Sequence, residues 1–272
     1  MIEVFGGTGF VGSEFCKRYK DECNVVPRET LEVPQDSAIL YLISTVDNYN
    51  VLTDPYVDIN TNLIHLMKVL EANKDRNVTF HFVSSWFVYG EVELPARESS
   101  CCKPKGFYSI TKLAAEQLIE SYCKTFKIKY TITRLGNVIS KGDGKVSKKK
   151  NALQYLIEEM KNDRDIKLYD QGLFYRDFVH VEDVAEGLRF VIDNGVNGEV
   201  YNLGSAAKPI LFKDVIDYIR QELNSHSPIG TMKATEFHDI VQVKNMYLEC
   251  SKLTNLGWKP SKTVLQAIKQ TL

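Results

Sequence analysis

The chain of 272 residues has no apolar run that approaches the roughly 20 residues needed to cross a bilayer. Because it opens directly on residues with the character of a core strand, we also expect no leader of the secretory type. These two absences exclude a membrane-spanning helix and argue against export. We therefore expect a cytoplasmic protein with no membrane partner.

A strong charge of either sign is also absent. The 34 Lys and Arg residues are balanced by 35 Asp and Glu residues, which leaves a formal net charge of -1 at pH 7. Domains that bind nucleic acid usually carry a clear excess of positive charge. Because 44% of the residues are hydrophobic, the chain has ample material for a large core. We expect a globular protein that does not bind nucleic acid.

Paired cysteines at metal-binding spacing are missing as well, and a chain of this size does not need disulfides for stability. We therefore expect no metal site, and free thiols at all six cysteines. These are Cys16, Cys23, Cys101, Cys102, Cys123 and Cys250. His81 and His180 lie in apolar, strand-like segments. There a hydrogen-bonded core histidine is expected rather than a metal ligand.

Apolar segments of strand length alternate with segments of helical periodicity over the first two-thirds of the chain. The expected strands are residues 39–43, 78–85 and 130–134, and the expected helices are residues 57–72 and 108–126. Further helices are expected over residues 151–161, 181–193 and 212–223. This order is typical of a parallel sheet covered by helices on both faces. We predict an α/β protein with a Rossmann-type, doubly wound parallel sheet.

A glycine-rich turn follows the first apolar segment. Gly7, Gly9 and Gly12 fit the pattern G-x-G-x-x-G between an expected strand and an expected helix from residue 13. Such a turn lets the backbone approach a pyrophosphate, which then lies at the helix N-terminus. The strand before it and the helix after it are the context that a dinucleotide site requires. The expected cofactor contacts are Gly6, Gly7, Gly9, Phe10, Val11 and Gly12.

The end of the expected second strand, residues 24–26, bears on which dinucleotide is bound. The acidic residue that usually contacts a ribose 2′-hydroxyl is absent, and Arg28 stands there instead. A guanidinium suits the 2′-phosphate of NADP. The alternative is that Glu29 takes the acidic role and Arg28 is a solvated loop charge. The sequence favours NADP(H) over NAD(H) and leaves NAD(H) open.

Tyr108 and Lys112 form a candidate proton-transfer pair. At a spacing of four on a helix, both side chains project from one face, so the ammonium can favour the ionised phenol. Alone this spacing is common on helix surfaces. Ser85, at the end of an expected strand about twenty residues upstream, adds a hydroxyl that could bind the reacting oxygen.

Taken together, five motifs in order resemble the extended short-chain dehydrogenase/reductase family of nucleotide-sugar epimerases, dehydratases and ketoreductases. They are the glycine turn, residues 83–90, Tyr108-x-x-x-Lys112, residues 134–138 and residues 176–185. The ending, residues 251–260, is similar to that family's C-terminal signature. The resemblance spans nearly the whole chain.

The resemblance implies that Tyr108 is the acid/base, Lys112 lowers its pKa and binds the nicotinamide ribose, and Ser85 binds the reacting oxygen. It implies that Asn60 helps to order the cofactor site. Two residues, Asn137 and Arg176, resemble contacts to a nucleotide-sugar pyrophosphate. An Arg-Asp pair at a strand edge is the alternative explanation of Arg176.

One family feature is missing, since residues 237–244 contain no phosphate-binding arginine. Lys244 or the cluster Lys148 to Lys150 could supply that charge, although a solvated loop is the simpler role for the Lys145–Lys150 stretch. The resemblance also implies a homodimer through a four-helix bundle. It divides the chain into a Rossmann domain, residues 1–140 with return segments near 177–205, and mainly a smaller substrate-binding lobe, residues 141–272.

The residues after Ser85 bear on the reaction. Family dehydratases have an Asp-Glu pair at this point, whereas this chain has Trp86-Phe87, which argues against a 4,6-dehydratase. Trp86 could shape the substrate pocket or pack as core. We predict a keto-sugar reductase that uses NADPH, with an NAD-dependent 4-epimerase as the alternative. A non-enzymatic dinucleotide sensor is a third possibility, which the presence of Ser85, Tyr108 and Lys112 disfavours.

Overall fold

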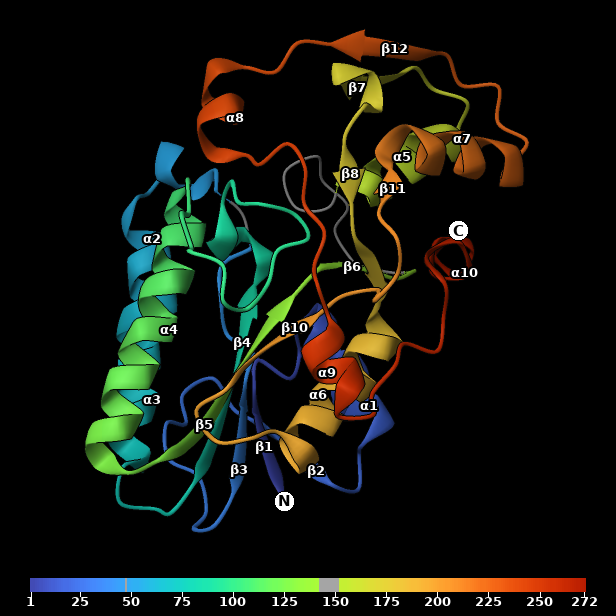
Figure 1. The fold of residues 1–272 in the computed structure, drawn as a ribbon. Helices are drawn as coiled ribbons and strands as arrows, with labels where there is room; N and C mark the ends of the chain where they lie inside the picture. Colours follow the sequence, from blue (N-terminus) through green and yellow to red (C-terminus); the bar gives the residue numbers. More distant parts are fainter. Residues whose placement is uncertain (47, 142–151) are drawn as a thin grey trace.

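A computed structural model describes residues 1–46, 48–141 and 152–272. At its centre lies a parallel sheet with the strand order β10-β5-β4-β3-β1-β2 (Figure 1). The strands are β1 (Ile2–Phe5), β2 (Cys23–Val26), β3 (Ala38–Tyr41), β4 (Thr79–Ser85), β5 (Lys129–Leu135) and β10 (Val200–Leu203). The predicted doubly wound α/β fold is confirmed.

The central strands are buried along nearly their whole length. All four residues of β1 are buried, and in β4 and β5 only the first residue is not. A parallel sheet with helices on both faces requires this pattern, because neither face of a strand meets water. Near-continuous apolar runs, rather than strict alternation, therefore identify these strands in the sequence.

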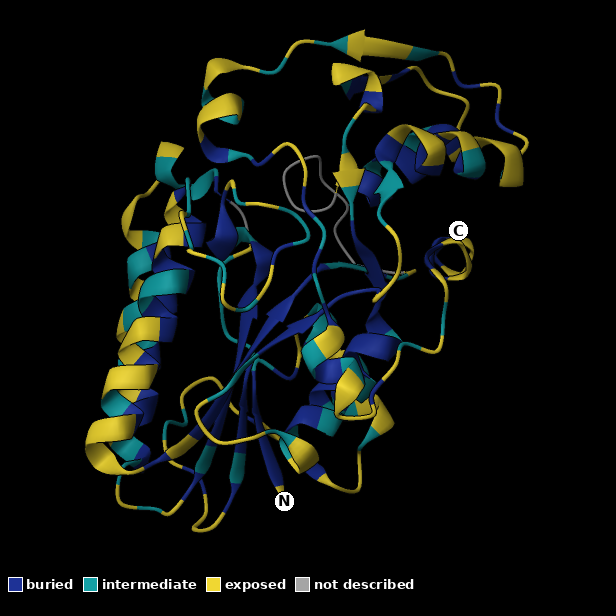
Figure 2. Cartoon of the chain, in the orientation of Figure 1, coloured by how far each residue is buried: buried dark blue, intermediate teal, exposed yellow. Residues whose placement is uncertain are grey.

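Helices cover both faces of the sheet (Figure 1). On one face α3 (His65–Asn73) and α4 (Phe107–Phe126) pack over β3, β4 and β5. On the other face α1 (Phe10–Arg18) lies against α6 (Val181–Asn194), with α9 (Ser251–Asn255) beside β10. Figure 2 shows the buried sides of these helices turned toward the sheet.

The expected helix over residues 57–72 is interrupted. It consists of α2 (Tyr56–Ile59), a π-helical turn η2 (Asn60–Ile64) and α3. A π-turn has a wider hydrogen-bond spacing than an α-helix, so it changes which side chains face the sheet. Such turns are frequent at functional sites.

The second half of the chain forms most of a smaller lobe above the carboxyl edge of the sheet (Figure 1). Its helices α5 (Ala152–Lys161), α7 (Phe212–Glu222) and α10 (Val264–Thr271) share one apolar core. Two small strand pairs, β7 (Ile166–Tyr169) with β12 (Ile229–Met232) and β8 (Tyr175–Arg176) with β11 (Ile210–Leu211), complete it. The short helix α8 (Glu236–Val241) reaches back over the sheet edge.

Part of the second half returns to the first. β9 (Phe178–His180) pairs with β6 (Asn137–Ile139), α6 then packs on α1, and β10 joins the central sheet beside β5. The segment near 177–205 therefore lies with the nucleotide-domain sheet. The exact division at residue 140 stays a prediction, since residues 142–151 lie outside the described part of the chain.

The strand order predicts a crevice at the carboxyl end of β1. β1 lies between β2 and β3, so the chain leaves β1 to one side and returns to the other. At such a switch point the loops after the strands diverge and leave room for a ligand at the carboxyl edge. No helix in the described residues is long and apolar enough to cross a membrane.

Candidate active site

The glycine turn joins β1 to α1 at this crevice. Gly6 has a φ of 83°, which side chains with a Cβ rarely adopt. A Cβ on Gly12 would lie 2.3 Å from the carbonyl oxygen of Gly6, so only glycine allows α1 to approach the turn this closely. Gly7 is buried, and the amide of Gly9 donates to Gly6 at 3.0 Å.

The first turn of α1 supplies the donors that a pyrophosphate would need. Gly9 precedes the helix, and Phe10 and Val11 are its first residues. The first amides of a helix have no partner within the helix, and the helix dipole places positive charge there. The cradle and its free donors fit a dinucleotide, although the individual contacts stay predictions.

Ser85 is the last residue of β4, and there the chain turns into η3 (Trp86–Tyr89). Its backbone is still extended, and its Oγ accepts a hydrogen bond from the amide of Phe87 at 3.3 Å. Because that contact uses Oγ as an acceptor, its proton remains available for donation. The strand end therefore fixes the hydroxyl at the carboxyl edge of the sheet.

Tyr108 lies in the first turn of α4, directly opposite that edge. Its side chain is only 8% exposed. Burial raises the pKa of the Tyr108 phenol, the contact with the Ser85 hydroxyl lowers it, Asp58 raises it and the Ser44 hydroxyl lowers it. The structure thus brings Tyr108 and Ser85 together, as their positions in the sequence predicted.

Lys112 is one turn further along α4 and is 2% exposed. Its Nζ donates to the carbonyl oxygen of Val83 at 2.6 Å and lies 4.0 Å from the ring centroid of Phe82. Burial lowers the pKa of Lys112 to about 7, and the charge of Glu116 opposes that shift. The expected lowering of the Tyr108 pKa by Lys112 is not what this site shows, since burial raises that pKa and the ammonium is turned to Val83.

Below Lys112 a second charge pair is buried. Glu116 and Arg134, both about 5% exposed, form a forked ion pair with an Nη2–Oε2 distance of 2.6 Å and an Nε–Oε1 distance of 3.1 Å. The guanidinium lies 4.7 Å from the ring centroid of Tyr89. Two parallel hydrogen bonds make this geometry directional as well as strong.

The ordering role expected of Asn60 falls to a different residue. Asn60 is exposed, whereas Asn62 is 3% exposed. The Asn62 amide accepts hydrogen bonds from Thr45 and Ser44, and donates to Thr45 and to Thr111 of α4 at 2.9 Å. It therefore ties the loop after β3 to the helix that bears Tyr108. The π-turn brings Asn62 to the inner face.

Trp86 packs as core, with 4% of its surface exposed. Its ring stacks on Phe87 at 3.9 Å, and Phe87 meets the edge of Tyr108 at 6.0 Å. Phe87, which the sequence did not single out, is therefore the aromatic wall nearest the candidate acid/base.

Arg176 and Asn137 lie where the lobe joins the sheet. Arg176 is half-buried, and its Nη2 donates to the carbonyl oxygen of Val243 at 3.0 Å. It forms no pair with Asp177, whose carboxylate accepts from the amides of residues 205 and 248. Asn137 donates to the carbonyl oxygen of Asp177 at 2.9 Å. Their phosphate-binding roles stay predictions.

The two alternative phosphate-binding lysine sets are placed differently. Lys244 is exposed and pairs with Asp170 at 2.8 Å. The cluster Lys145–Lys150 lies outside the described residues. Of these two sets, only Lys244 lies in the described part of the chain, and there it is ion-paired.

Arg28 follows β2 and is exposed. The pKa of His65 is lowered mainly by burial, then by the charge of Lys68 and then by the charge of Arg28. Arg28 is therefore close enough to act on His65 electrostatically. His65 is held in turn by the Tyr41 hydroxyl at 3.0 Å. Arg28 and Lys68 are thus the cationic neighbours of His65.

The other residues that the sequence singled out are structural. All six cysteines are free. His81 is buried and its Nδ1 lies 2.8 Å from the Thr131 hydroxyl. His180 caps α6 by accepting from the amide of Glu182 at 3.3 Å. The structure thus gives both histidines the hydrogen-bonded core role that was predicted.

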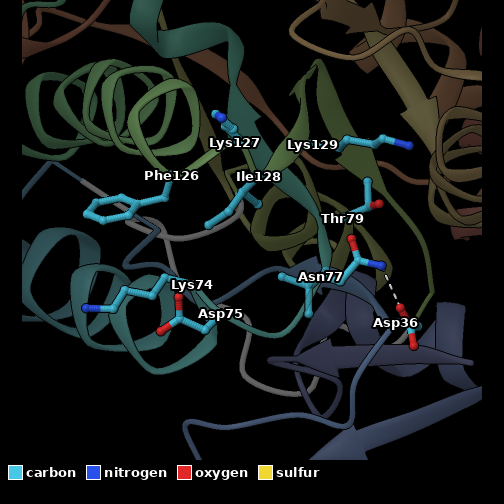
Figure 3. A pocket seen from close by; sticks show the side chains of 10 residues that line it. Asp36, Lys74, Asp75, Asn77, Thr79, Phe126, Lys127, Ile128 and Lys129 are labelled. Carbon is cyan, nitrogen blue, oxygen red and sulfur yellow. Dashed lines mark hydrogen bonds between the residues drawn. The ribbon is translucent and has the colours of Figure 1, made fainter.

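A separate pocket lies at the opposite edge of the sheet, where β4 and β5 begin (Figure 3). Ser85 ends the seven-residue strand that starts at Thr79, so this pocket is roughly 20 Å from the candidate site. It is lined by Asp36, Lys74, Asp75, Asn77, Val78, Thr79, Phe126, Lys127, Ile128 and Lys129. None of the candidate site residues lines it.

Comparison with known proteins supplies the family context. The model of the NAD dependent epimerase/dehydratase family matches residues 33–204. A dTDP-glucose 4,6-dehydratase of Mycolicibacterium smegmatis is 29% identical over 177 residues, which are 64% of this chain and 52% of that protein. The match thus spans about half the length of that relative.

Two further proteins match over nearly their whole length. A putative UDP-glucose 4-epimerase of Methanocaldococcus jannaschii is 24% identical, with 100% of this chain and 97% of that protein covered. The solved structure of RMD from Pseudomonas aeruginosa complexed with NADPH is 23% identical. It covers 99% of this chain and 96% of its own with a TM-score of 0.83, and at that identity it shows the fold alone.

The buried Lys112 generates a prediction about stability. With a pKa of about 7 in the folded chain and about 10.4 when unfolded, the unfolded chain binds more protons between these values. Stability should therefore rise with pH across this range. Lys112→Met removes the charge, so the cofactor-free variant should gain about 2 to 4 kcal/mol at pH 7 and lose that pH dependence.

Urea unfolding of both proteins between pH 6 and pH 9 measures this. The matched control is Lys167→Met on β7, whose side chain is exposed, and it should change stability by less than about 0.5 kcal/mol. A Lys112→Met protein that is less stable at pH 7, with the parent's pH slope, would contradict the argument.

Proposed function

The chain belongs to the NAD dependent epimerase/dehydratase family, and we propose that it reduces the 4-keto group of a nucleotide-linked sugar with NADPH. The observation that carries the proposal is the meeting of three side chains. Ser85 and Tyr108 share a hydroxyl contact at the end of β4, with Lys112 one helical turn away. Phe87, and no carboxylate of the described residues 85–90, adjoins that contact.

The residues at the crevice fit the cofactor that this family uses. The turn from Gly6 to Gly12 leaves room for a backbone-bound pyrophosphate, and Lys112 lies where it can turn from Val83 to a ribose hydroxyl. When bound, a nicotinamide supplies the hydride. The chain's own residues do the rest.

Proton transfer is the task of Tyr108. Because burial raises its pKa, the phenol is protonated at neutral pH, and a protonated phenol is the form that can donate to the oxygen of a carbonyl as it is reduced. Ser85 can donate a second hydrogen bond to the same oxygen and so stabilise the charge that develops there. The raised pKa keeps the phenol in the protonated form that the reductive step requires.

The neighbours of Ser85 argue against dehydration. Elimination of water from the sugar needs an additional acid and base, and Trp86-Phe87 supplies neither. Phe87 instead places an apolar ring against Tyr108 in a T-shaped contact. The similarity to dehydratases, at 29% identity over 64% of this chain, therefore reflects the family rather than the reaction.

A 4-epimerase is the second candidate. It needs the same three side chains, and the match to a putative UDP-glucose 4-epimerase covers the whole of this chain. The two differ in how they treat the cofactor, because an epimerase regenerates it within each turnover and a reductase exchanges it. Mass spectrometry of the purified protein distinguishes them, since firmly retained NAD⁺ supports the epimerase.

A sensor without catalysis is the third candidate. It would bind a dinucleotide and show no turnover with any keto-sugar or epimerisable sugar. Assays of both reactions, with the cofactor titration described below, separate it from the enzymes.

Homodimerisation is part of the proposal. Exposed apolar side chains follow α4 and the neighbouring segment α2–η2. They are Phe107, Ile110, Leu118 and Phe126 on α4, with Tyr56 and Ile64 beside them. Leu113, by contrast, packs against the Trp86 cluster. Two copies of this face would form a four-helix bundle and remove the apolar surface from water.

Tyr108→Phe tests the acid/base role. The ring still packs, so cofactor affinity should change little, while turnover should fall by about 10² to 10⁴ fold, the range typical of general acid catalysis. Steady-state rates and a cofactor titration measure the two quantities. Tyr122→Phe on the same helix is the control, and its turnover should match the parent; substantial turnover by Tyr108→Phe would rule out the assignment.

Arg28→Ala tests the cofactor choice. A charge-assisted contact to the 2′-phosphate is worth about 1.5 to 3 kcal/mol, or roughly ten to a hundredfold preference for NADPH over NADH. The variant should lose most of that preference with little change toward NADH, whereas Arg164→Ala, at an exposed ion pair in the lobe, should keep it. Equal affinity of the parent for both cofactors would refute the NADPH proposal.

Leu118→Lys tests the dimer. Its side chain is 38% exposed on α4, and a charge there should oppose burial between two copies. Light scattering at micromolar concentration should find a dimer for the parent and a monomer for this variant. Leu256→Lys, at a residue 42% exposed on the far side, should stay dimeric; a monomeric parent would contradict the proposal.

A further inference from the structure

The hydroxyl groups of the candidate site are shielded from solvent. Ser85 is 9% exposed and Tyr108 is 8% exposed. A substrate has to bring its reacting oxygen within hydrogen-bond distance of such groups. Part of the protein therefore moves before a substrate enters, and we expect the moving part to be the one with the fewest buried contacts.

A strap, residues 233–247, runs from the lobe to the central domain (Figure 1). At one end it continues β12, which pairs with β7 of the lobe. At the other end it reaches Leu248, which bridges to Ala96 and belongs to the apolar cluster of Trp86. Both ends are thus fixed in regular structure or in core. In α8 between them, whose six residues are all described, Val241 alone is buried.

Aromatic side chains from both sides of the crevice hold α8. From the central domain, the Tyr49 hydroxyl lies 3.0 Å from Nδ1 of His238, and the Tyr49 ring meets the Phe237 ring at a centroid distance of 5.4 Å. From the lobe, the ring of Tyr169 at the end of β7 stacks on the His238 ring at 4.3 Å. His238 is therefore the residue that joins the two sides.

The strap crosses at the start of α4, the helix that carries the candidate acid/base (Figure 1). Asn48, the residue before the tyrosine that holds His238, accepts a hydrogen bond from the amide of Ser109 at 3.4 Å. Lys105, two residues before α4, donates to the carbonyl oxygen of Asp239 at 3.0 Å. Because α8 is attached beside both the loop after β3 and the segment that leads into α4, it lies over the first turn of α4.

We propose that α8 is a lid over the candidate site and that His238 is its latch. This role rests on the proposed function, because Ser85 and Tyr108 define the site that the lid covers. A helix of six residues has little stability of its own, so the position of α8 depends on the contacts of its side chains. Opening breaks these contacts while both ends of the strap stay in place. Closing re-forms them and excludes water from the site.

Tyr49→Phe tests the latch, because it removes only the hydroxyl that reaches His238. Loss of one hydrogen bond should favour the open lid by about 2- to 10-fold. Hydrogen exchange of the cofactor-free protein, followed by mass spectrometry, should show this increase in the amides of α8 and of Gln242, which donates to the carbonyl oxygen of His238 at 2.9 Å. The matched control is Tyr218→Phe on α7, which should leave the exchange of α8 unchanged.

Alkylation of a thiol inside the site tests whether α8 covers it. Ser85→Cys places a thiol at the end of β4, and peptide mapping measures its rate of reaction with N-ethylmaleimide. Cys101, which is exposed, reacts in the same sample and is the internal control. Adding Tyr49→Phe should raise the rate at the new thiol by the same factor as the exchange of α8, with no change at Cys101, because both processes depend on one opening equilibrium.

Two outcomes would overturn the proposal. One is equal exchange of α8 in the parent and in Tyr49→Phe, a measurement that needs no cysteine variant. The other is faster exchange of α8 with an unchanged rate at the new thiol, which would mean that α8 opens but covers nothing. If circular dichroism shows that Ser85→Cys is unfolded, Ser44→Cys supplies the thiol, since the Ser44 hydroxyl also contacts Tyr108.

Neither measurement needs substrate, cofactor or turnover. A failure to find reductase or epimerase activity would refute the proposed reaction and leave both lid measurements readable. The lid and the proposed reaction are therefore judged separately.

Discussion

The burial of one ammonium group organises this molecule. Three contacts stabilise the buried Lys112 ammonium. It donates to the carbonyl oxygen of Val83, it lies over the ring of Phe82, and the carboxylate of Glu116 is one turn further along α4. Glu116 is stable in the interior because Arg134 of β5 forms a bidentate ion pair with it. A buried charge is stable only when it has such partners. Burial of Lys112 at the site is therefore linked to a second buried ion pair between α4 and the sheet.

The polar contacts beneath Lys112 continue to the edge of the sheet. The Arg134 guanidinium stacks on Tyr89, and the Tyr89 hydroxyl donates to Asn202 of β10 at 2.6 Å. Asn202 also donates to the carbonyl oxygen of Ala96 at 3.0 Å. This connection ties β10, from the second half of the chain, to the polar residues beneath Lys112.

Stability and chemistry are opposed at the carboxyl edge. An unpaired carboxylate oxygen at Asp58 and a buried lysine with a pKa near 7 both cost folding free energy. The apolar layers of the sheet and its helices offset that cost from outside the site.

The sequence by itself determined the order of strands and helices, the glycine turn and the Ser85, Tyr108 and Lys112 set, since these follow from periodicity, local turn geometry and fixed spacing. Only the tertiary structure decided that Asn62 rather than Asn60 orders the site, that Phe87 rather than Trp86 faces Tyr108, and that Asp58 is buried beside it. The physical reason is the direction in which each side chain points. A π-turn at residues 60–64 and the turn after β4 change which side chains face inward, and a regular helical or strand period does not contain that change.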